Sequence, residues 1–122
     1  MTPKVLLVED SETTNFINKL VLNSAGILDI SEVLNGLDAY HYIHQNCPDV
    51  ILLDIDMPVM DGWEFLKEKE MKALCLDAKV IMLTSSTHPR DKKMAKKYAS
   101  VVAYLEKPLT LEKLKEVNML MN

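Results

Sequence analysis

Three short apolar runs in this chain each end directly before charged side chains, and this pattern constrains the fold more than any other feature. The runs and the charged residues that follow them are Val5–Val8 before Glu9 and Asp10, Val50–Leu53 before Asp54, and Val101–Leu105 before Glu106 and Lys107. Runs of this length are typical of strands that are buried on both faces of a parallel sheet. Ligands of such sheets bind outside the carboxyl ends of the strands, so the charged residues are predicted to share one site.

Helical patterns alternate with the apolar runs, which predicts five strands that are each followed by a helix. Strands are expected over residues 4–8, 27–33, 49–53, 79–83 and 101–105, and helices over residues 13–25, 36–47, 61–71, 89–98 and 111–120. Right-handed crossovers make such a (βα)5 chain an α/β fold with a doubly wound five-stranded parallel sheet. With 122 residues, of which 48% are hydrophobic, we expect one domain over residues 1–122.

Capping residues and apolar spacing predict the ends and the inward faces of these helices. Ser11 or Thr13 can cap the first helix, Asp61 the third, and Thr87 or His88 the fourth. The residues expected to face the core are Phe16, Ile17, Leu20, Val21 and Ala25; Ala39, Tyr40 and Ile43; Trp63, Phe65, Leu66 and Met71; and Leu111, Leu114, Val117 and Leu120.

The charge distribution is uneven and argues against several classes of partner. The net charge is −4, but residues 1–77 hold 14 acidic and 5 basic side chains, whereas residues 78–122 hold 4 acidic and 9 basic ones. An acidic domain lacks the positive field that nucleic-acid binding needs, so no direct nucleic acid partner is expected. No segment is long and apolar enough to span a bilayer, and residues 1–4 lack the apolar core of a signal peptide. We therefore expect a cytoplasmic protein without a membrane partner.

The two cysteines, Cys47 and Cys75, lie far apart in the sequence and lack the spacing of metal ligands. Reducing conditions inside cells keep most thiols free. Buried free thiols are therefore favoured over a disulfide or a redox pair, and no function is assigned to either residue.

The predicted site gathers carboxylates with one cation and one hydroxyl group. Glu9, Asp10 and Asp54 would lie together, and such a cluster is unfavourable unless protons or a cation offset its charge. Oxygen ligands without a histidine or cysteine cluster favour Mg²⁺ over zinc or copper. A metal-held carboxylate favours a phosphoryl group, whose oxygens Thr84 could hydrogen-bond and Lys107 could neutralise. The pattern thus predicts a phosphoryl site that uses Mg²⁺.

Motifs along essentially the whole chain resemble the receiver domain of two-component response regulators, in the manner of the chemotaxis regulators. In family order they are Leu6-Leu7-Val8-Glu9-Asp10, Leu34-Asn35-Gly36, Asp49–Asp54, Met57-Pro58, Met60-Asp61-Gly62, Thr84-Ser85 and Lys107-Pro108. The resemblance implies a flavodoxin-like receiver fold, in agreement with the predicted order of strands and helices.

The same resemblance implies roles for the acidic residues. Asp54 would be the phosphoacceptor, and Asp10 and Asp54 would ligate Mg²⁺. Glu9 would act through its charge and through metal-bound water. The backbone carbonyl of Asp56 would complete the protein ligands of the metal.

The resemblance also implies roles for residues on the other side of the site. Thr84 and Lys107 match the contacts to the phosphoryl group, and Thr84 is also part of the switch. Tyr104 matches an aromatic residue that swings inward on activation, although the amphipathic pattern of its strand is an alternative explanation. Pro108 matches a proline that usually follows a cis peptide bond, which would fix the direction of the Lys107 ammonium.

The function implied by the resemblance is that of a phosphorylation-dependent switch in a two-component phosphorelay. It would not be an enzyme, apart from Mg²⁺-dependent self-phosphorylation from a donor and self-dephosphorylation. A sensor histidine kinase or a phosphotransfer protein would be the donor, and a downstream protein would bind through residues 88–122. Two alternatives stay open: a haloacid dehalogenase-like phosphatase, whose nucleophile and acid pair Asp54-Ile55-Asp56 mimics, and an interaction module that is independent of phosphorylation.

Two segments depart from the common family pattern. Tyr98-Ala99-Ser100 stands where many receivers have Ala-Gly-Ala, so the turn before the fifth strand must form without glycine. The fourth helix is unusually basic, with Arg90, Lys92, Lys93, Lys96 and Lys97. This helix is either a solvated surface or a surface that binds an acidic partner.

Overall fold

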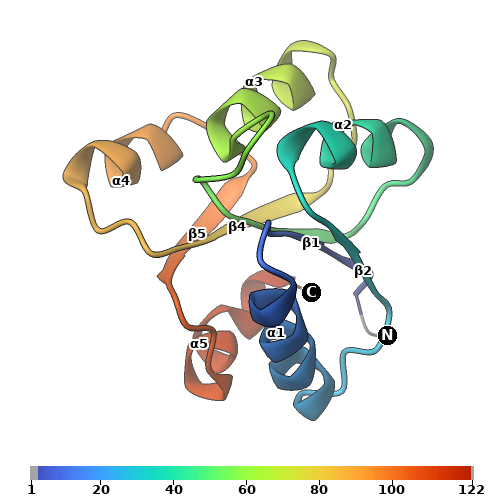
Figure 1. Ribbon diagram of the computed structural model, residues 1–122, viewed down its shortest axis with the longest axis vertical. Coiled ribbons are helices and arrows are strands. Elements are labelled where there is room, and N and C mark those ends of the chain that lie inside the picture. The colour runs from blue at the N-terminus through green and yellow to red at the C-terminus, as the bar shows by residue number, and fades with distance from the viewer. Residues whose placement is uncertain (1–2, 122) are drawn as a thin grey trace.

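Five strands and five helices alternate along the computed structural model, which describes residues 3–121 (Figure 1). The strands are β1 (Val5–Val8), β2 (Ile30–Val33), β3 (Val50–Leu53), β4 (Lys79–Thr84) and β5 (Val101–Glu106). The helices are α1 (Glu12–Ser24), α2 (Gly36–Gln45), α3 (Gly62–Met71), α4 (Pro89–Ala95) and α5 (Leu111–Met121). This order confirms the predicted alternation. The ends of the expected domain, residues 1–2 and residue 122, lie outside the described residues.

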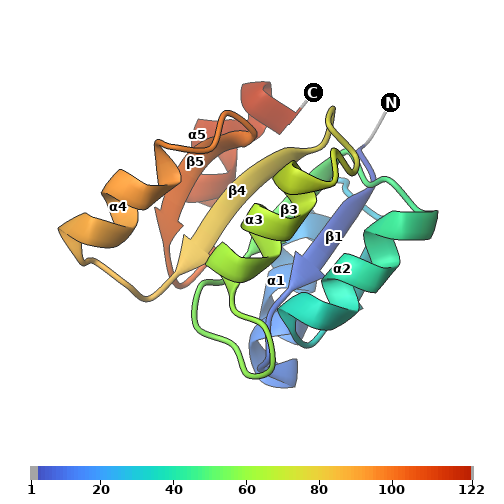
Figure 2. The ribbon, with the colours of Figure 1, turned by 90° about the horizontal axis from the view of Figure 1, so that it is seen from above.

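All five strands run parallel in one sheet, in the order β2-β1-β3-β4-β5. Helices α1 and α5 cover one face of the sheet, and α2, α3 and α4 lie over the other (Figures 1 and 2). The connections that leave β1 and β3 therefore go to opposite faces, which opens a crevice between the carboxyl ends of these two neighbouring strands. This is the doubly wound, flavodoxin-like sheet that the sequence predicts.

Alternate residues of the central strands point to opposite faces and form two cores. Leu6 and Val8 pack with residues of α2, α3 and α4, whereas Val5 and Leu7 pack with residues of α1 and α5. Every residue of β1 and β3 is buried. Burial on both faces explains why these strands consist of unbroken apolar runs.

The inward face of α1 differs from the predicted one. The predicted core residues with large exposed fractions are Phe16 at 62%, Ile17 at 44% and Leu20 at 53%. Ala25, also predicted to face the core, is exposed as well. Asn15, Asn18 and Leu22 are buried instead. Asn15 Nδ2 donates a hydrogen bond of 3.0 Å to the carbonyl oxygen of Glu9, and this contact fixes which side of the helix faces the sheet. An apolar face of α1 is consequently open to solvent.

Three further residues predicted to face the core, on α3 and α5, are exposed: Met71, Leu111 and Leu120. Met71 is the last residue of α3 and Leu111 is the first of α5, so both lie at a helix end. Leu120 is exposed because Val117 and Met121 occupy the inward positions of the last turn. Lys69 of α3 shows the opposite deviation: it was not predicted to face the core, yet it is fully buried.

The observed helix ends agree with the predicted caps. Ser11 Oγ accepts a hydrogen bond from the Thr14 N–H, and Asp61 forms a capping box with Glu64. His88 caps α4, and Pro89 occupies its first turn.

The longest of the described helices, α1, has 13 residues. In this part of the chain no helix is long and apolar enough to cross a bilayer.

The turn before β5 forms without glycine. Helix α4 ends at Ala95, three residues earlier than predicted. The Tyr98 N–H then donates to the Ala95 carbonyl over 3.3 Å, and the Val101 N–H donates to the Tyr98 carbonyl over 3.1 Å. None of residues 96–100 has a positive φ, so the backbone path here does not require glycine.

The prediction of two free thiols is wrong. Cys47 and Cys75 form a disulfide, with their Cα atoms 5.3 Å apart. Cys47 follows α2 and Cys75 follows α3, and these helices pack side by side on the same face of the sheet (Figure 2). The packing brings the segments after the two helices together, although 28 positions separate the cysteines in the sequence.

Candidate functional site

The carboxyl ends of β1 and β3 bring together the acidic residues that the sequence singles out. Val8 of β1 pairs with Leu53 of β3, so Glu9 and Asp54 follow at the same level of the sheet. One carboxylate oxygen from each of Glu9, Asp10 and Asp54 lies within 4.8 Å of the other two. The predicted shared site at this edge of the sheet is therefore present as a cluster.

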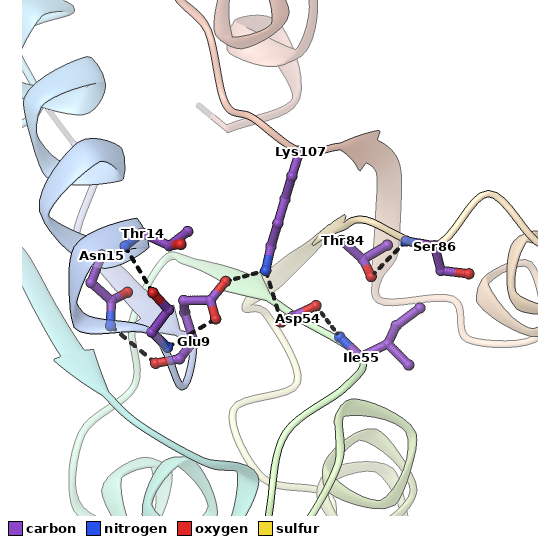
Figure 3. Close-up of polar contacts among 9 residues, drawn as sticks. Glu9, Thr14, Asn15, Asp54, Ile55, Thr84, Ser86 and Lys107 are labelled. Atoms are coloured by element: carbon purple, nitrogen blue, oxygen red, sulfur yellow. Dashed lines mark hydrogen bonds and ion pairs between the residues drawn. The ribbon is translucent and has the colours of Figure 1, made fainter.

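Glu9 is buried, and the start of α1 holds it in place. Its Oε2 atom accepts a hydrogen bond of 3.1 Å from the Ser11 N–H, and its carbonyl oxygen accepts from Asn15 Nδ2 (Figure 3). Ser11 also caps α1 through Thr14. The cap and the buried amide thus fix both the backbone and the carboxylate of Glu9.

Asp54 is also buried, and the backbone around it is tightly packed. Its Oδ1 atom accepts a hydrogen bond of 2.8 Å from the Ile55 N–H (Figure 3). Its own N–H donates to the Val8 carbonyl over 3.0 Å. The backbone of Gly62 lies against the Asp54 carbonyl, where a Cβ atom would clash. Glycine is therefore required at the start of α3 for the loop to approach Asp54 this closely.

Lys107 reaches the two buried carboxylates from the end of β5. Its ammonium lies 2.9 Å from Asp54 Oδ2 and also forms an ion pair with Glu9 Oε1 (Figure 3). The Lys107 N–H donates to the Thr84 carbonyl over 2.9 Å, which ties this strand end to β4. The peptide bond between Lys107 and Pro108 is cis, as the resemblance implies.

Burial and charge act in opposite directions on the groups of this cluster. Burial raises the pKa of the Glu9 carboxyl, the nearby Asp10 and Asp54 add to this effect, and the Lys107 ion pair opposes it. Burial would lower the pKa of Lys107, but its bonds to Glu9 and Asp54 outweigh burial, so the pKa is raised. Lys107 therefore stays charged and offsets part of the negative charge.

The donor set fits a hard divalent cation. Only carboxylate oxygens contribute to the cluster of Glu9, Asp10 and Asp54, and Asp10 is exposed, which leaves an approach from solvent. Oxygen ligands of this kind suit Mg²⁺. Asp56 is exposed, and its side chain is not among the clustered carboxylates. Its expected contribution is a backbone carbonyl, which stays a prediction.

Thr84 and Tyr104 meet at the loop that follows β4. Thr84 is fully buried, and its Oγ1 atom accepts a hydrogen bond of 3.2 Å from the Ser86 N–H (Figure 3). The Tyr104 hydroxyl donates to the Ser86 carbonyl over 2.8 Å. Burial raises the pKa of Tyr104, against the opposing effect of this hydrogen bond, so the hydroxyl keeps its proton. Both proposed switch residues therefore bind the same loop residue.

Two residues of this arrangement are absent from the sequence-based prediction. Asn15 lies four residues after the cap of α1, where apolar spacing alone predicts a surface position. Ser86 follows the Thr84-Ser85 motif but carries no recognisable signal of its own. The signal that could have indicated Asn15 is the Glu9 carbonyl at the end of β1, which needs a hydrogen-bond donor from a nearby side chain.

A family model for the response regulator receiver domain matches residues 5–118. The chain belongs to this family. Receiver domains interact with sensor kinases and with downstream targets, and they are generally not enzymes in their own right. The match confirms the resemblance that the motifs carry.

Individual relatives differ in how much of their length this receiver domain spans. The chemotaxis protein CheY from Halobacterium salinarum is 35% identical over 109 residues, which cover 88% of this chain and 87% of CheY. The autoinducer 1 sensor kinase/phosphatase LuxN from Vibrio campbellii is 31% identical over 116 residues, or 95% of this chain. The chain spans only 13% of the length of LuxN.

Solved structures of other receiver proteins share the fold. The chemotaxis protein CheY4 from Vibrio cholerae matches over 100% of both chains, with a TM-score of 0.86 and 30% identity. The receiver domain of the sensor histidine kinase PA1611 from Pseudomonas aeruginosa matches over 96% of this chain and 94% of that domain, with a TM-score of 0.82 and 25% identity. In that structure a magnesium ion is coordinated in the active site cleft.

Proposed function

We propose that residues 1–122 form one receiver domain that accepts a phosphoryl group on Asp54 and changes its partner-binding surface in response. The observation that carries this proposal is the position of the buried Asp54, between the carboxylates of Glu9 and Asp10 and the ammonium of Lys107. A nucleophilic carboxylate beside a fixed cation suits phosphoryl transfer.

In the proposed reaction a carboxylate oxygen of Asp54 forms a bond to phosphorus as the bond from phosphorus to the donor breaks. The electron pair of the broken bond stays with the donor, which is the imidazole of a phosphohistidine or the carboxylate of acetyl phosphate. Lys107 neutralises charge on the phosphoryl oxygens, and Thr84 donates a hydrogen bond to one of them. Asp10, Asp54 and the Asp56 carbonyl would hold Mg²⁺ near Glu9. When bound, Mg²⁺ supplies further positive charge.

The proposed donor is a sensor histidine kinase or a phosphotransfer protein, and the open face of α1 supports a protein donor. Phe16, Ile17 and Leu20 form an exposed apolar face on α1, which begins two residues after Asp10. A hollow of about 390 Å³ beside Phe16 is rimmed by charged residues, namely Glu12, Lys19 and Glu32. An apolar patch with a charged rim beside the phosphorylation site is typical of a protein contact.

The proposed output surface covers residues 88–122 and centres on α4 and β5. A hollow of about 400 Å³ between these elements is lined by Lys92, Lys96 and Tyr104, among others. The exposed basic side chains of α4 favour a downstream partner with an acidic contact surface. Because Tyr104 both lines this hollow and binds the loop after Thr84, a change at Thr84 would reach the partner surface.

Family membership does not favour the haloacid dehalogenase-like alternative. An interaction module that is independent of phosphorylation would have no use for three carboxylates held close to a lysine, since their repulsion costs stability. The proposed catalysis is limited to Mg²⁺-dependent phosphorylation of Asp54 from a donor and loss of the same phosphoryl group.

Intact mass spectrometry after incubation with acetyl phosphate and Mg²⁺ tests the proposal. The wild-type protein should gain one phosphoryl group, and Asp54→Asn should gain none. Asp10→Asn should fail for another reason, which is weaker Mg²⁺ binding in a calorimetric titration. Equal phosphorylation of Asp54→Asn would refute the assignment of the acceptor, and an unchanged Mg²⁺ affinity in Asp10→Asn would refute its role as a ligand.

The α1 face has a separate test. Leu20→Glu should slow phosphorylation by a histidine kinase or phosphotransfer protein, because it places a charge on the docking face. Phosphorylation by acetyl phosphate, which needs no docking face, should keep its rate. If both rates were unchanged, the donor would bind elsewhere.

A further inference from the structure

A chain of hydrogen bonds leads from Thr84 to the surface between α3 and α4. The Ser86 N–H binds Thr84 Oγ1, and Ser86 Oγ donates to Asp91 Oδ2 over 2.6 Å. The other carboxylate oxygen of Asp91 accepts a hydrogen bond of 3.1 Å from Trp63 Nε1. Asp91 therefore joins the loop after β4 to the first turn of α3.

Trp63 also contacts the segment that follows α4. Its ring stacks on Tyr98 with a centroid separation of 6.2 Å and an interplanar angle of 11°. Asp91 lies in the first turn of α4, and Tyr98 lies just beyond its end. The single tryptophan of this chain thus contacts both the first turn of α4 and the segment that follows this helix. Helices α3 and α4 are neighbours on the same face of the sheet (Figure 2).

The links in this chain of hydrogen bonds differ in strength. A hydroxyl that donates to an ionised carboxylate over a short distance makes a strong hydrogen bond, and the Ser86 to Asp91 contact is of this kind. The same hydrogen bond from Ser86, opposed by burial and helped by Trp63, lowers the pKa of Asp91 and keeps it ionised. The 3.2 Å contact between neutral groups at Thr84 is the weakest link. The strong links hold Ser86, Asp91 and Trp63 together as one unit.

We propose that Asp91 is a positioning residue of the switch, which makes the loop after β4, the first turn of α4 and Trp63 move together when Thr84 turns toward Asp54. This inference rests on the proposed phosphorylation of Asp54. It extends the responsive surface from residues 88–122 to the start of α3, because Trp63 moves with the loop. Without Asp91, the loop could move while Trp63 stayed in place.

Tryptophan fluorescence tests this inference directly, because all emission of this kind comes from Trp63. The probe is beryllium fluoride with Mg²⁺, a stable mimic of the phosphoryl group. The wild-type protein should change its emission on saturation with the probe, and Asp54→Asn should not. Asp91→Ala should weaken the coupling between the loop and Trp63 about fivefold, the factor by which loss of one ordinary hydrogen bond changes an equilibrium constant, and the emission change should shrink with it.

Three further variants separate coupling from general damage to the fold. Ser86→Ala breaks the link between Thr84 and Asp91 without touching the Trp63 contact, so it should reduce the change as Asp91→Ala does. Asp91→Asn keeps the shape, its Oδ1 atom can still accept from Trp63 Nε1, and its Nδ2 atom can donate to Ser86 Oγ in place of the reverse bond, so it should restore most of the change. Asp77→Ala removes an exposed carboxylate on the loop after α3 and should behave as the wild type.

Intact mass after acetyl phosphate treatment is measured on every variant, which distinguishes two kinds of failure. A wild-type protein that gains no phosphoryl group would overturn the proposed function and this inference with it. A protein that gains the group on Asp54 but shows no emission change would overturn this inference alone. Full emission changes in both Asp91→Ala and Ser86→Ala would do the same.

Discussion

The ammonium of Lys107 lies 2.9 Å from Asp54 Oδ2, although the two residues are 53 positions apart in the sequence. The same ammonium pairs with Glu9, so one lysine offsets two buried carboxylates. Asp10 adds a third carboxylate to the cluster. The fold therefore holds an excess of negative charge at the end of β1 and β3, and Lys107 keeps that excess tolerable in the absence of a metal ion.

Lys107→Met should destabilise the protein in EDTA by about 3 kcal/mol, the lower end of the cost of removing one partner from a buried ion pair. The lower end applies because the Lys107 side chain is 22% exposed. Mg²⁺ should reduce this loss, because a divalent cation can neutralise the same carboxylates. Urea denaturation in EDTA and in Mg²⁺ measures both effects. Lys115→Met, which replaces an exposed lysine of α5, serves as the control.

Asp54→Asn should have the opposite effect in EDTA. It removes one negative charge from the cluster, while Lys107 keeps its ion pair with Glu9. We expect a gain of about 1 kcal/mol in the free energy of unfolding, the scale of interactions between partly screened charges. Mg²⁺ should reduce the difference in the free energy of unfolding between Asp54→Asn and the wild type, since it binds and stabilises the folded wild-type site by mass action.

The sign of this effect makes the test demanding, because most substitutions of buried residues destabilise a protein. Urea denaturation of the wild type, Asp54→Asn and the surface control Asp77→Asn in EDTA gives the answer. A loss of stability in Asp54→Asn, with Asp77→Asn unchanged, would contradict the view that the acidic cluster carries excess charge.

The disulfide leads to a prediction about stability under reducing conditions. A bridge between Cys47 and Cys75 closes a loop with a sequence separation of 28 residues. Breaking a bridge that closes a loop of this length should lower the free energy of unfolding by about 3.5 kcal/mol, because the unfolded chain gains entropy. Dithiothreitol should therefore lower the urea midpoint of the wild type, and it should leave Cys47→Ser/Cys75→Ser unchanged. An equal midpoint with and without dithiothreitol in the wild type would refute this contribution.

The architecture was predictable because its signals are local and repeated. Buried parallel strands appear as unbroken apolar runs, and caps such as Ser11 and Asp61 mark helix starts. Apolar spacing failed on α1, where the tertiary contact of Asn15 with the Glu9 carbonyl decides which face is buried. Spacing also cannot show that the segments after α2 and α3 meet, so the bridge between Cys47 and Cys75 was missed.

The sequence predicted the residues on one side of the candidate site but not those on the other. Glu9, Asp10 and Asp54 each follow a strand, and the topology alone gathers them at one edge. The link from Ser86 through Asp91 to Trp63 depends on the path of one loop and on the angle between two helices. Neither is encoded in a short motif, so only the structure brings these side chains together.

Lys69 is the clearest case of a buried group that spacing did not anticipate. It lies on α3, its side chain is fully buried, and its Nζ atom has no hydrogen-bond partner among residues 3–121. Burial lowers the pKa of Lys69 below its ordinary value of 10.5, and the neighbouring Glu70 opposes this only in part. An amine that loses water without gaining a partner destabilises the folded state.

Lys69→Met should therefore raise the free energy of unfolding by about 2 kcal/mol at neutral pH, the scale of the penalty for a buried unsatisfied donor. Methionine has a similar length and fills the same space without a polar group. Lys67→Met, an exposed position on the same helix, should change stability little. Urea denaturation of the wild type, Lys69→Met and Lys67→Met at neutral pH measures their free energies of unfolding.

The pH dependence of the same comparison tests the cause. Because the pKa of Lys69 is lower in the folded state than in the unfolded state, the unfolded chain binds more protons between the two pKa values. The contribution of Lys69 to stability should thus improve as the pH rises through the folded-state pKa toward 10.5. Methionine does not titrate, so the advantage of Lys69→Met over the wild type should be largest at neutral pH and shrink in alkaline buffer. An advantage that stayed constant from neutral pH to pH 10.5 would mean that packing, and not the buried amine, is responsible.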